Sequence, residues 1–269
     1  MAGGTYGRNF MIHPTAIIDP TAHLATDVEV GPYAIIGKYV TIGKGTTIGA
    51  HAVIGDWTAL GENNRIFPQS SVGAPPQDLK YRGEECWTRI GDNNMIREFA
   101  TIHRGTATGH AETVVGNDNL FMAYSHVAHD CVLGNGIVMA NVATLAGHVT
   151  IEDNVIIGGL VAVHQFSSIG KNAMIGGGTM VGMDILPYTI ATTGKREAKL
   201  RGLNLIGLKR RGFSENTINN LKKSYRTLFM ANLKLPDAID RIKAEITDCP
   251  EVDYLLNFIE NSKRGICRG

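Results

Sequence analysis

From Ile12 onward, an aliphatic residue recurs at every sixth position of the chain. The first hexads are IHPTAI, IDPTAH, LATDVE and VGPYAI, and the period continues through VGAPPQ at Val72. It resumes at IGDNNM, IREFAT and IHRGTA, resumes again at VGNDNL, and runs unbroken to VGMDIL at Val181. This period predicts a parallel β-helix, in which the aliphatic residue points inward and three hexads make one triangular coil. Glycine and other small residues are expected at the tight corners.

Two polar segments interrupt the period. They are DLKYRGEECWTR, from Asp78 to Arg89, and TGHAETV, from Thr108 to Val114. We predict that both loop out from corners of the β-helix, which leaves the stacking of the remaining hexads intact. Polar loops on a rigid scaffold often contain functional residues.

After Pro187 the pattern changes to helical spacing. Ser214 is placed to cap a helix whose apolar residues recur at helical spacing from Ile218 to Phe229. Pro236 and Pro250 each suit the first turn of a further helix. The segment from Leu203 to Ser214 is predicted to be a shorter helix that ends at Gly212.

Three regions follow from these patterns. Residues 1–11 are interpreted as an N-terminal extension or a cloning scar, residues 12–187 as the β-helix, and residues 188–269 as a small helical domain.

The chain contains no run of eighteen apolar residues and no signal peptide, which predicts a soluble protein without an integral membrane segment. Its four cysteines lie far apart with no CxxC spacing, so we expect a cytoplasmic location.

Charge is distributed unevenly along the chain. Residues 1–187 have 10 Lys and Arg against 16 Asp and Glu, a net charge of −6, whereas residues 188–269 have 16 against 9, a net charge of +7. The C-terminal part is therefore the better place for an anionic partner, and a solvated helical surface rich in lysine is the alternative. We expect no nucleic-acid partner.

The hexad register gathers histidines on one face. With the two loops set aside, the hexads from Val72, Ile102, Val127, Leu145 and Val163 stack on the same face in successive coils. Coils lie about 4.8 Å apart, so residues distant in sequence become neighbours. The residues gathered in this way are His103, His129, His148 and His164, with His126 at the corner leading into the face and Gln77 where the first loop leaves.

Three chemistries suit such a row of histidines. Neutral imidazoles bind zinc, as in β-helix enzymes that hydrate carbon dioxide, but nothing here fixes a third ligand. Cys131 stands two residues after His129, in a hexad position that favours a packed thiol over a nucleophile. A neutral histidine is also a suitable general base, with Asp130 beside it and a glycine-rich backbone N–H for an oxyanion, which suits acyl transfer from a thioester to an alcohol.

The motifs QDLKY, TIHRGT, HVAHDC, ATLAGHV, AVHQF and GLKRRGFS occur in this order from Gln77 to Ser214. In this series the chain resembles the UDP-N-acetylglucosamine O-acyltransferases, which begin lipid A synthesis. The resemblance implies a left-handed β-helix, a homotrimer with active sites between neighbouring subunits, and no cofactor or metal. It also implies an acyl-carrier protein that donates a 3-hydroxyacyl chain to the glucosamine 3-hydroxyl of the UDP-sugar.

The same resemblance assigns roles to residues. His129 is the general base, Asp130 its support, and Gly147 the oxyanion donor through its backbone N–H. The positions that bind substrate are Gln77, Asp78, Lys80, His103, His126, His148, His164 and Gln165, and those near the uridine diphosphate are Asn204, Arg210 and Arg211. Gly177 falls at the acyl-length ruler, where glycine leaves room for a longer chain.

One departure and three alternatives remain. Ile206 stands where family members often have glutamate, so a contact to the uracil is expected to be weaker. The N-acyltransferase of the same pathway, which usually has an additional N-terminal domain, would form an amide on a 3-amino sugar. A zinc carbonic anhydrase of this fold would bind metal, and a purely structural β-helix would have no activity.

Overall fold

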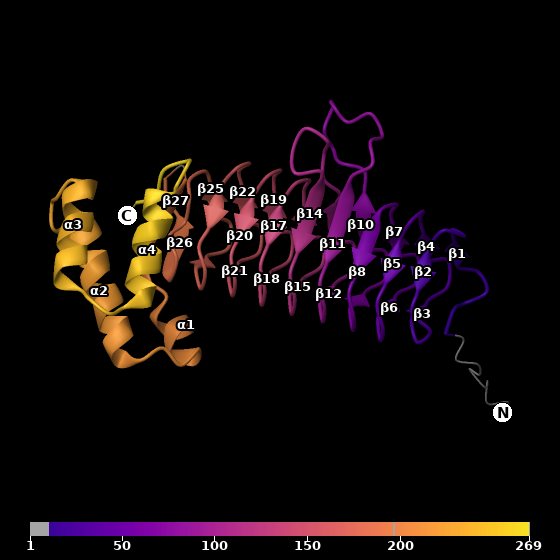
Figure 1. Ribbon diagram of the computed structural model, residues 1–269, viewed down its shortest axis with the longest axis horizontal. Coiled ribbons are helices and arrows are strands. Elements are labelled where there is room, and N and C mark those ends of the chain that lie inside the picture. Colours follow the sequence, from indigo (N-terminus) through magenta and orange to yellow (C-terminus); the bar gives the residue numbers. More distant parts are fainter. Residues whose placement is uncertain (1–10, 196, 269) are drawn as a thin grey trace.

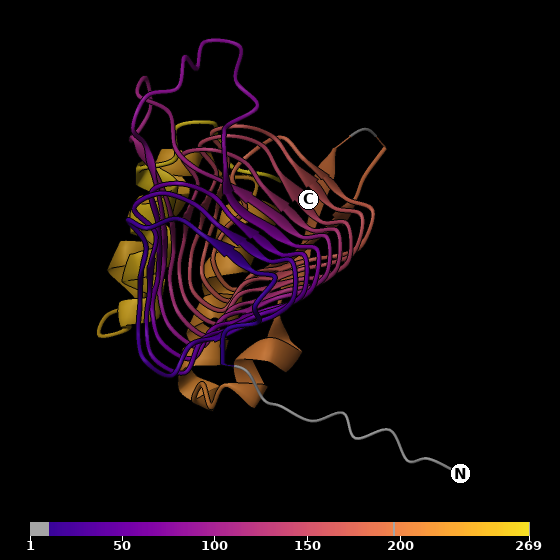
Figure 2. The same cartoon turned by 90° about the vertical axis from the view of Figure 1, so that its right-hand side faces the viewer.

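The computed structural model describes residues 11–195 and 197–268, so the predicted extension lies, except for Met11, outside the described residues. Figure 1 shows a long stack of short strands with a group of helices at its C-terminal end. Viewed along the stack, the coils have a triangular outline (Figure 2). The predicted parallel β-helix followed by α-helices is therefore confirmed.

Three sheets form the faces of the prism. Face one contains β3 (Glu29–Val30), β6 (Thr47–Ile48), β9 (Arg65–Ile66), β12 (Met95–Ile96), β15 (Leu120–Phe121), β18 (Val138–Met139), β21 (Ile156–Ile157), β24 (Met174–Ile175), β26 (Thr189–Thr193) and β27 (Ala198–Leu203). Face two contains β1 (Ile17–Ile18), β4 (Ile35–Ile36), β7 (Val53–Ile54), β10 (Ser71–Ala74), β13 (Thr101–His103), β16 (His126–Val127), β19 (Thr144–Leu145), β22 (Ala162–Val163) and β25 (Met180–Val181). Face three contains β2 (His23–Leu24), β5 (Thr41–Ile42), β8 (Thr58–Leu60), β11 (Trp87–Ile90), β14 (Glu112–Val115), β17 (Val132–Leu133), β20 (Thr150–Ile151) and β23 (Ser168–Ile169).

The register on face two is the predicted one. Val72 pairs with Ile102, Ile102 with Val127, Val127 with Leu145, and Leu145 with Val163. These aliphatic side chains are at most 3% exposed, and burying each of them stabilises the fold by about 1.5–3 kcal/mol. The residue before each of them lies on the outer surface, because side chains alternate along a strand.

The corners are named here after the face that each one follows. Corner one contains Tyr124 and Leu160, corner two contains Asp130 and His148, and corner three contains Asn154. All five are turn residues with φ between 58° and 63°. The expectation of small residues at the corners is therefore wrong for these positions, where larger side chains adopt the left-handed conformation and project outward.

A ladder of buried asparagines lies inside corner three. The backbone N–H of Asn94 donates to Oδ1 of Asn64 at 2.9 Å, and that of Asn119 donates to Oδ1 of Asn94 at 3.0 Å. Oδ1 of Asn119 in turn accepts from the N–H of Ile137 at 2.7 Å. Each side-chain amide also donates to a carbonyl of the next coil, so these amides are satisfied across coils.

Both insertions project from corner two (Figures 1 and 2). The first occupies residues 75–86 rather than 78–89, because Trp87–Ile90 pairs with β8 and β14 as strand β11. The second occupies residues 104–111 rather than 108–114, because Glu112–Val115 forms strand β14. Backbone pairing with the neighbouring coils thus extends the sheet into polar sequence at the end of each insertion.

The helices begin later than expected. Residues 189–193 form β26 and residues 198–203 form the antiparallel β27, so the chain does not continue directly into helix after Pro187. The predicted helix from Leu203 to Gly212 is shorter, as α1 (Leu205–Arg210). It is followed by α2 (Glu215–Met230), α3 (Leu235–Glu245) and α4 (Pro250–Glu260). Oγ of Ser214 accepts from the N–H of Thr217 as the predicted cap. Among the described residues, no helix is long and apolar enough to span a bilayer.

Candidate active site

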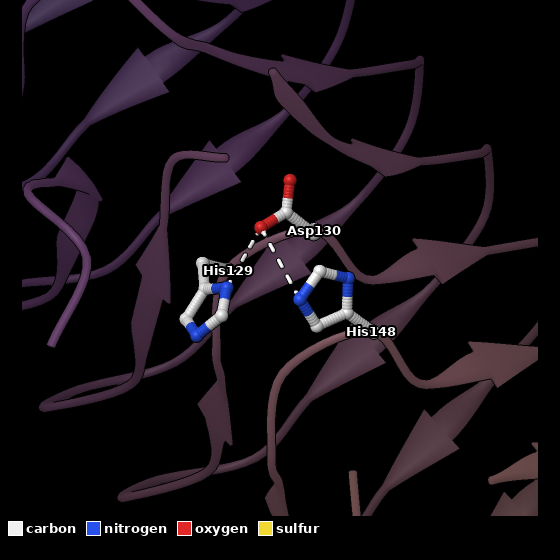
Figure 3. A group of neighbouring side chains, drawn as sticks. All are labelled: His129, Asp130 and His148. Atoms are coloured by element: carbon white, nitrogen blue, oxygen red, sulfur yellow. Dashed lines mark hydrogen bonds and ion pairs between the residues drawn. The ribbon is translucent and has the colours of Figure 1, made fainter. Parts of the chain in front are cut away.

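The centre of the site lies at corner two, where β16 and β19 end in adjacent coils (Figure 3). His129 and Asp130 form the turn after β16, and His148 occupies the turn after β19. Nδ1 of His129 lies 2.7 Å from Oδ2 of Asp130, which is hydrogen-bonding distance. Stacking of the coils therefore brings the adjacent residues His129 and Asp130 together with His148, eighteen positions after Asp130, in one cluster.

Asp130 is buried, with 1% of its surface exposed. Burial alone would raise the pKa of its carboxyl group, but hydrogen bonds from His129, Thr106 and the N–H of His110 outweigh burial and lower that pKa to about 2. The carboxylate is therefore an anion that only accepts hydrogen bonds. It follows that Nδ1 of His129 bears the hydrogen and that Nε2 has the free lone pair.

Gly147 lies directly against the His129 ring. A Cβ atom at this position would meet Cε1 and Nε2 of His129 at 2.6 and 2.8 Å, closer than carbon and nitrogen atoms pack. Within the described part of the chain, the N–H of Gly147 donates to no acceptor. Corner two thus presents a basic nitrogen beside an available N–H donor, the pair that acyl transfer requires.

His148 is oriented by its neighbours. Its Nε2 lies 3.8 Å from Oδ2 of Asp130, and its ring stacks on Phe166 with centroids 4.6 Å apart. Burial lowers the pKa of His148, although Asp130 opposes that shift. Asp78, on the first insertion, also acts on this pKa, so the predicted loop residue lies near the cluster.

His103 and His126 extend the cluster along face two, with ring centroids 4.9 Å apart. Burial, together with His126, His129 and Arg104, lowers the pKa of His103 to about 4. Its Nδ1 is buried with no hydrogen-bond partner among the described residues. Burial also lowers the pKa of His126, whose Nδ1 lies 2.7 Å from Oγ1 of Thr101.

The placement of His126 and His129 corrects the expectation from sequence. His126 lies on strand β16 and His129 lies in the turn, the reverse of the predicted arrangement. Strand β16 is two residues long, and its aliphatic residue, Val127, is the second of them. The residue before it is therefore already on the face, pointing outward.

Other predicted site residues lie at the edge of the cluster or away from it. His164 and Gln165 are exposed beside Phe166 in the next coil, and Gln77 and Lys80 are exposed on the first insertion. Asn204 caps the start of α1, Arg210 is its last residue and Arg211 follows it, and Nη1 of Arg211 donates to Oδ1 of Asn154 at corner three. Gly177 lies at corner one, where a Cβ atom would meet only the carbonyl of Gly159, at 3.2 Å, and its backbone nitrogen. Within one chain, the residues at α1 and Gly177 therefore lie at other corners than His129.

The side chain of Asn204 is already engaged. Its Oδ1 accepts from the N–H of Gly207 at 3.1 Å, which caps α1, and its Nδ2 donates to the carbonyl of Asn172 at 3.0 Å. Ile206 on the same helix is 68% exposed.

The zinc and thiol alternatives do not fit the geometry. Possible ligand atoms of His129, Asp130 and His148 lie within 4.8 Å of one another. However, Nδ1 of His129 donates to Asp130, whose oxygens also accept three hydrogen bonds from Thr106 and His110. Among these three residues, one histidine nitrogen that faces the group is then free to bind a metal. A single free ligand is too few for a zinc site.

Burial raises the pKa of the Cys131 thiol to about 12, so Cys131 is the packed thiol that its hexad position predicted.

Sequence reasoning missed three contributors to the site, namely Thr106, Gly109 and Phe166. Thr106 lies in the quoted motif TIHRGT and Phe166 in AVHQF, so membership of a motif was the only signal in the sequence that could have identified these two residues. Gly109 belongs to the predicted second loop and lies against the Asp130 carboxylate, but nothing in the sequence of that loop indicates this position.

Comparisons with known proteins identify relatives of this chain. Residues 184–267 match the family described as "Udp N-acetylglucosamine O-acyltransferase; Domain 2". An acyl-[acyl-carrier-protein]–UDP-N-acetylglucosamine O-acyltransferase of Trichlorobacter lovleyi is 73% identical over 96% of this chain and 99% of its own length. The solved UDP-N-acetylglucosamine acyltransferase of Francisella novicida has a TM-score of 0.94 and 40% identity, covering 96% of this chain and 94% of that one. The Arabidopsis enzyme has a TM-score of 0.79 and 36% identity, covering 95% and 99%. The predicted fold class, a left-handed parallel β-helix with C-terminal helices, is thereby confirmed.

Proposed function

The chain belongs to the family of acyl-[acyl-carrier-protein]–UDP-N-acetylglucosamine O-acyltransferases, as its sequence motifs predicted, and from this membership we propose how it acts. It transfers a 3-hydroxyacyl chain from acyl-carrier protein to the 3-hydroxyl of the glucosamine unit, the first step of lipid A synthesis. His129 is the general base. The observation that supports this assignment is the hydrogen-bonded pair of His129 and Asp130 beside the unpaired N–H of Gly147.

The proposed reaction is one acyl transfer without a covalent enzyme intermediate. Nε2 of His129 removes the proton from the sugar hydroxyl while that oxygen bonds to the thioester carbonyl carbon. Negative charge develops on the carbonyl oxygen and is stabilised by the N–H of Gly147. The tetrahedral intermediate then collapses, the C–S bond breaks, and the imidazolium proton passes to the departing thiolate.

A second copy of the chain completes the site. Faces one and two meet at corner one, so two copies whose corners one lie together have face one of one copy against face two of the other. Corner three of the copy that presents face one, with Arg210 and Arg211, then lies opposite His129 at corner two of the copy that presents face two. This arrangement supports the homotrimer, and arginine suits the diphosphate of the sugar nucleotide.

An apolar surface on face one and corner one agrees with this packing. Ile156 and Leu160 are 37% and 67% exposed in the single chain. Water-exposed apolar side chains in a row over several coils are typical of an interface. The row consists of Met95, Leu120, Val138, Ile156 and Met174 on face one and Phe99, Tyr124, Val142 and Leu160 at corner one.

The trimer is tested by a charge on this surface. We expect Leu160→Glu to sediment as a monomer and to lose turnover, because a buried unpaired carboxylate opposes assembly. Val132→Glu places the same charge on face three, at a side chain that is 40% exposed, and is expected to remain trimeric. A trimeric Leu160→Glu protein, measured by analytical ultracentrifugation, would show that another face forms the interface.

A basic surface between α2 and α3 suits the acidic carrier protein. It is lined by Lys222, Lys223, Arg226 and Arg241, with Glu245 as the single acidic residue. Glu245 pairs with Lys223 and Arg241 at 2.9 and 2.6 Å. Among the described residues Lys222 and Arg226 have no ion pair, so they are available to a partner.

Arg226→Glu tests this docking surface. We expect KM for the acyl-carrier protein to rise about tenfold or more, because a like charge replaces an attraction. Turnover with an acyl-phosphopantetheine thioester is expected to be unchanged, since that donor lacks the acidic protein. An equal loss with both donors would refute docking at this surface.

His129→Ala tests the central assignment. With UDP-N-acetylglucosamine and 3-hydroxyacyl carrier protein, we expect near-complete loss of turnover from a protein that remains trimeric. Activity within tenfold of the unmodified protein would remove His129 as the base. The 3-amino analogue of the sugar, assayed beside it, determines whether ester or amide is the preferred product.

A further inference from the structure

The second insertion, residues 104–111, encloses the Asp130 carboxylate with hydrogen-bond donors. Oγ1 of Thr106 donates to Oδ2 at 2.6 Å, and the N–H of Thr106 donates to Oδ1 at 3.1 Å. The N–H of His110 donates to the same Oδ1 at 2.8 Å. With His129 on Oδ2, the carboxylate accepts four hydrogen bonds, three of them from this loop.

The second insertion packs closely against the Asp130 carboxylate. The N–H groups of Gly109 and Ala111 both donate to the carbonyl of Thr106 at 3.0 Å, which folds the loop into a tight turn. A Cβ atom on Gly109 would overlap the Asp130 carboxylate. On the other side, the N–H of Asp130 donates to Oγ1 of Thr113 at 2.8 Å. The Asp130 carboxylate is therefore held by three donors of the loop, and the Asp130 backbone by Thr113.

We propose that Thr106 is a positioning residue for the acyl transfer, and that the second insertion is a carboxylate-holding loop that acts on His129 through Asp130. The inference rests on the proposed role of His129. Thr106 is 2% exposed and touches the carboxylate rather than the cleft, so it affects the reaction without contacting a substrate.

The direction in which Thr106 affects His129 follows from the atom that both residues contact, Oδ2 of Asp130. Oδ2 accepts from both Thr106 and His129, so the short hydroxyl hydrogen bond withdraws electron density from the atom that faces the imidazole. Removing the hydroxyl makes the carboxylate more basic and a stronger partner for the imidazolium. The hydrogen bond between Asp130 and a protonated His129 is then strengthened, and the carboxylate also gains freedom to turn away from the productive geometry.

Several titratable groups face this pair. His103, His126 and His148 each interact electrostatically with His129, from β13, β16 and the turn after β19. His110 and Asp78, from the two insertions, act on His148. None of these groups is altered by a substitution at Thr106, so a change in pH dependence reports on Asp130 and His129.

Thr106→Val removes the hydroxyl and keeps the shape of the side chain. We expect kcat to fall about tenfold, since the hydroxyl hydrogen bond to a charged acceptor is lost, while KM for the sugar nucleotide is unchanged. The acid limb of the kcat/KM profile is expected to move to higher pH by about half a unit. Thr106→Ser retains the hydroxyl and is expected to restore both values.

Two further variants keep the test decisive. Gly109→Ala presses on the same carboxylate without removing a donor, and we expect it also to lower kcat with KM unchanged. Thr113→Val removes an acceptor of the Asp130 N–H and is expected to lower the melting temperature without moving the acid limb. An acid limb that stays in place in Thr106→Val, or a rise in KM that accounts for the whole loss, would overturn the proposal.

Histidine NMR separates this inference from the proposed base. The His129 pKa, read from 13C-labelled imidazole, is expected to rise in Thr106→Val whether or not His129 is the base. A raised pKa together with an active His129→Ala protein would reject the base and retain the positioning of His129 by Thr106. An unchanged pKa together with an inactive His129→Ala protein would reject the positioning and retain the base.

Discussion

Substituting Gly147 by alanine is a direct test of how closely the base is fitted. The added Cβ would lie 2.6 Å from Cε1 of His129, whereas carbon atoms pack at about 3.5–4.0 Å, so the ring must retreat by about 1 Å. Gly147 does not adopt a left-handed φ, so the backbone accepts alanine and the conflict is with the ring alone. A retreat of that size lengthens the 2.7 Å hydrogen bond to Asp130 beyond hydrogen-bonding distance.

A displacement of about 1 Å in a catalytic group costs about a hundredfold in rate, or about 2.7 kcal/mol of activation free energy. Steady-state assays of Gly147→Ala should therefore show kcat reduced by about two orders of magnitude with a normal melting temperature. Gly182→Ala is the matched control, because its Cβ would meet no atom closer than 3.4 Å. If Gly147→Ala retained kcat within threefold, the contact between Gly147 and the His129 ring would not matter to turnover.

Three further predictions concern the same site. Asp130→Asn should lower kcat about a hundredfold or more, since an amide N–H facing Nδ1 forces the opposite tautomer of His129, and normal turnover would contradict this account. Gly177→Met should shift the preferred acyl donor to a shorter chain in competition assays, whereas an unchanged preference would place the ruler elsewhere. Burial and neighbouring charges lower the pKa of His103 to about 4, below its ordinary value of 6.5, so the unfolded chain binds a proton that the folded chain does not. The free energy of unfolding should therefore fall as pH decreases from about 6.5 to 4, and this dependence should be weaker in His103→Gln, measured by urea denaturation at pH 7 and 5.

The stacking of the histidines was predictable because it depends only on counting aliphatic residues. One buried side chain per hexad fixes the face of every neighbour, so the pairing of Ile102, Val127 and Leu145 followed from the period alone. Because the observed strand pairs are the predicted ones, neither insertion adds a hexad to the stack or removes one. The general-base hypothesis depended on this register.

The surroundings of Asp130 were not predictable from the same count. Its donors come from an insertion without a period, and their positions depend on turns that close on Thr106. Strand β27 was also missed, because residues 198–203 pair antiparallel with β26 at the end of the stack, where no hexad pattern is required. Residues on α1 were assigned to the nucleotide by resemblance, and the internal hydrogen bonds of Asn204 could be seen only in the folded chain.

The asparagine ladder has a consequence for the alignment of the coils. Aliphatic residues on the three faces are nearly interchangeable, so a chain displaced by one full coil would still have a dry interior. The ladder position is filled by asparagine only at Asn64, Asn94 and Asn119, and by Val28, Ile137 and Val155 in other coils. A displaced coil would bury a side-chain amide against an aliphatic residue at a cost of about 1–3 kcal/mol for each unpaired group. The ladder therefore favours the correct alignment of the coils over a displaced one, through side chains buried inside corner three.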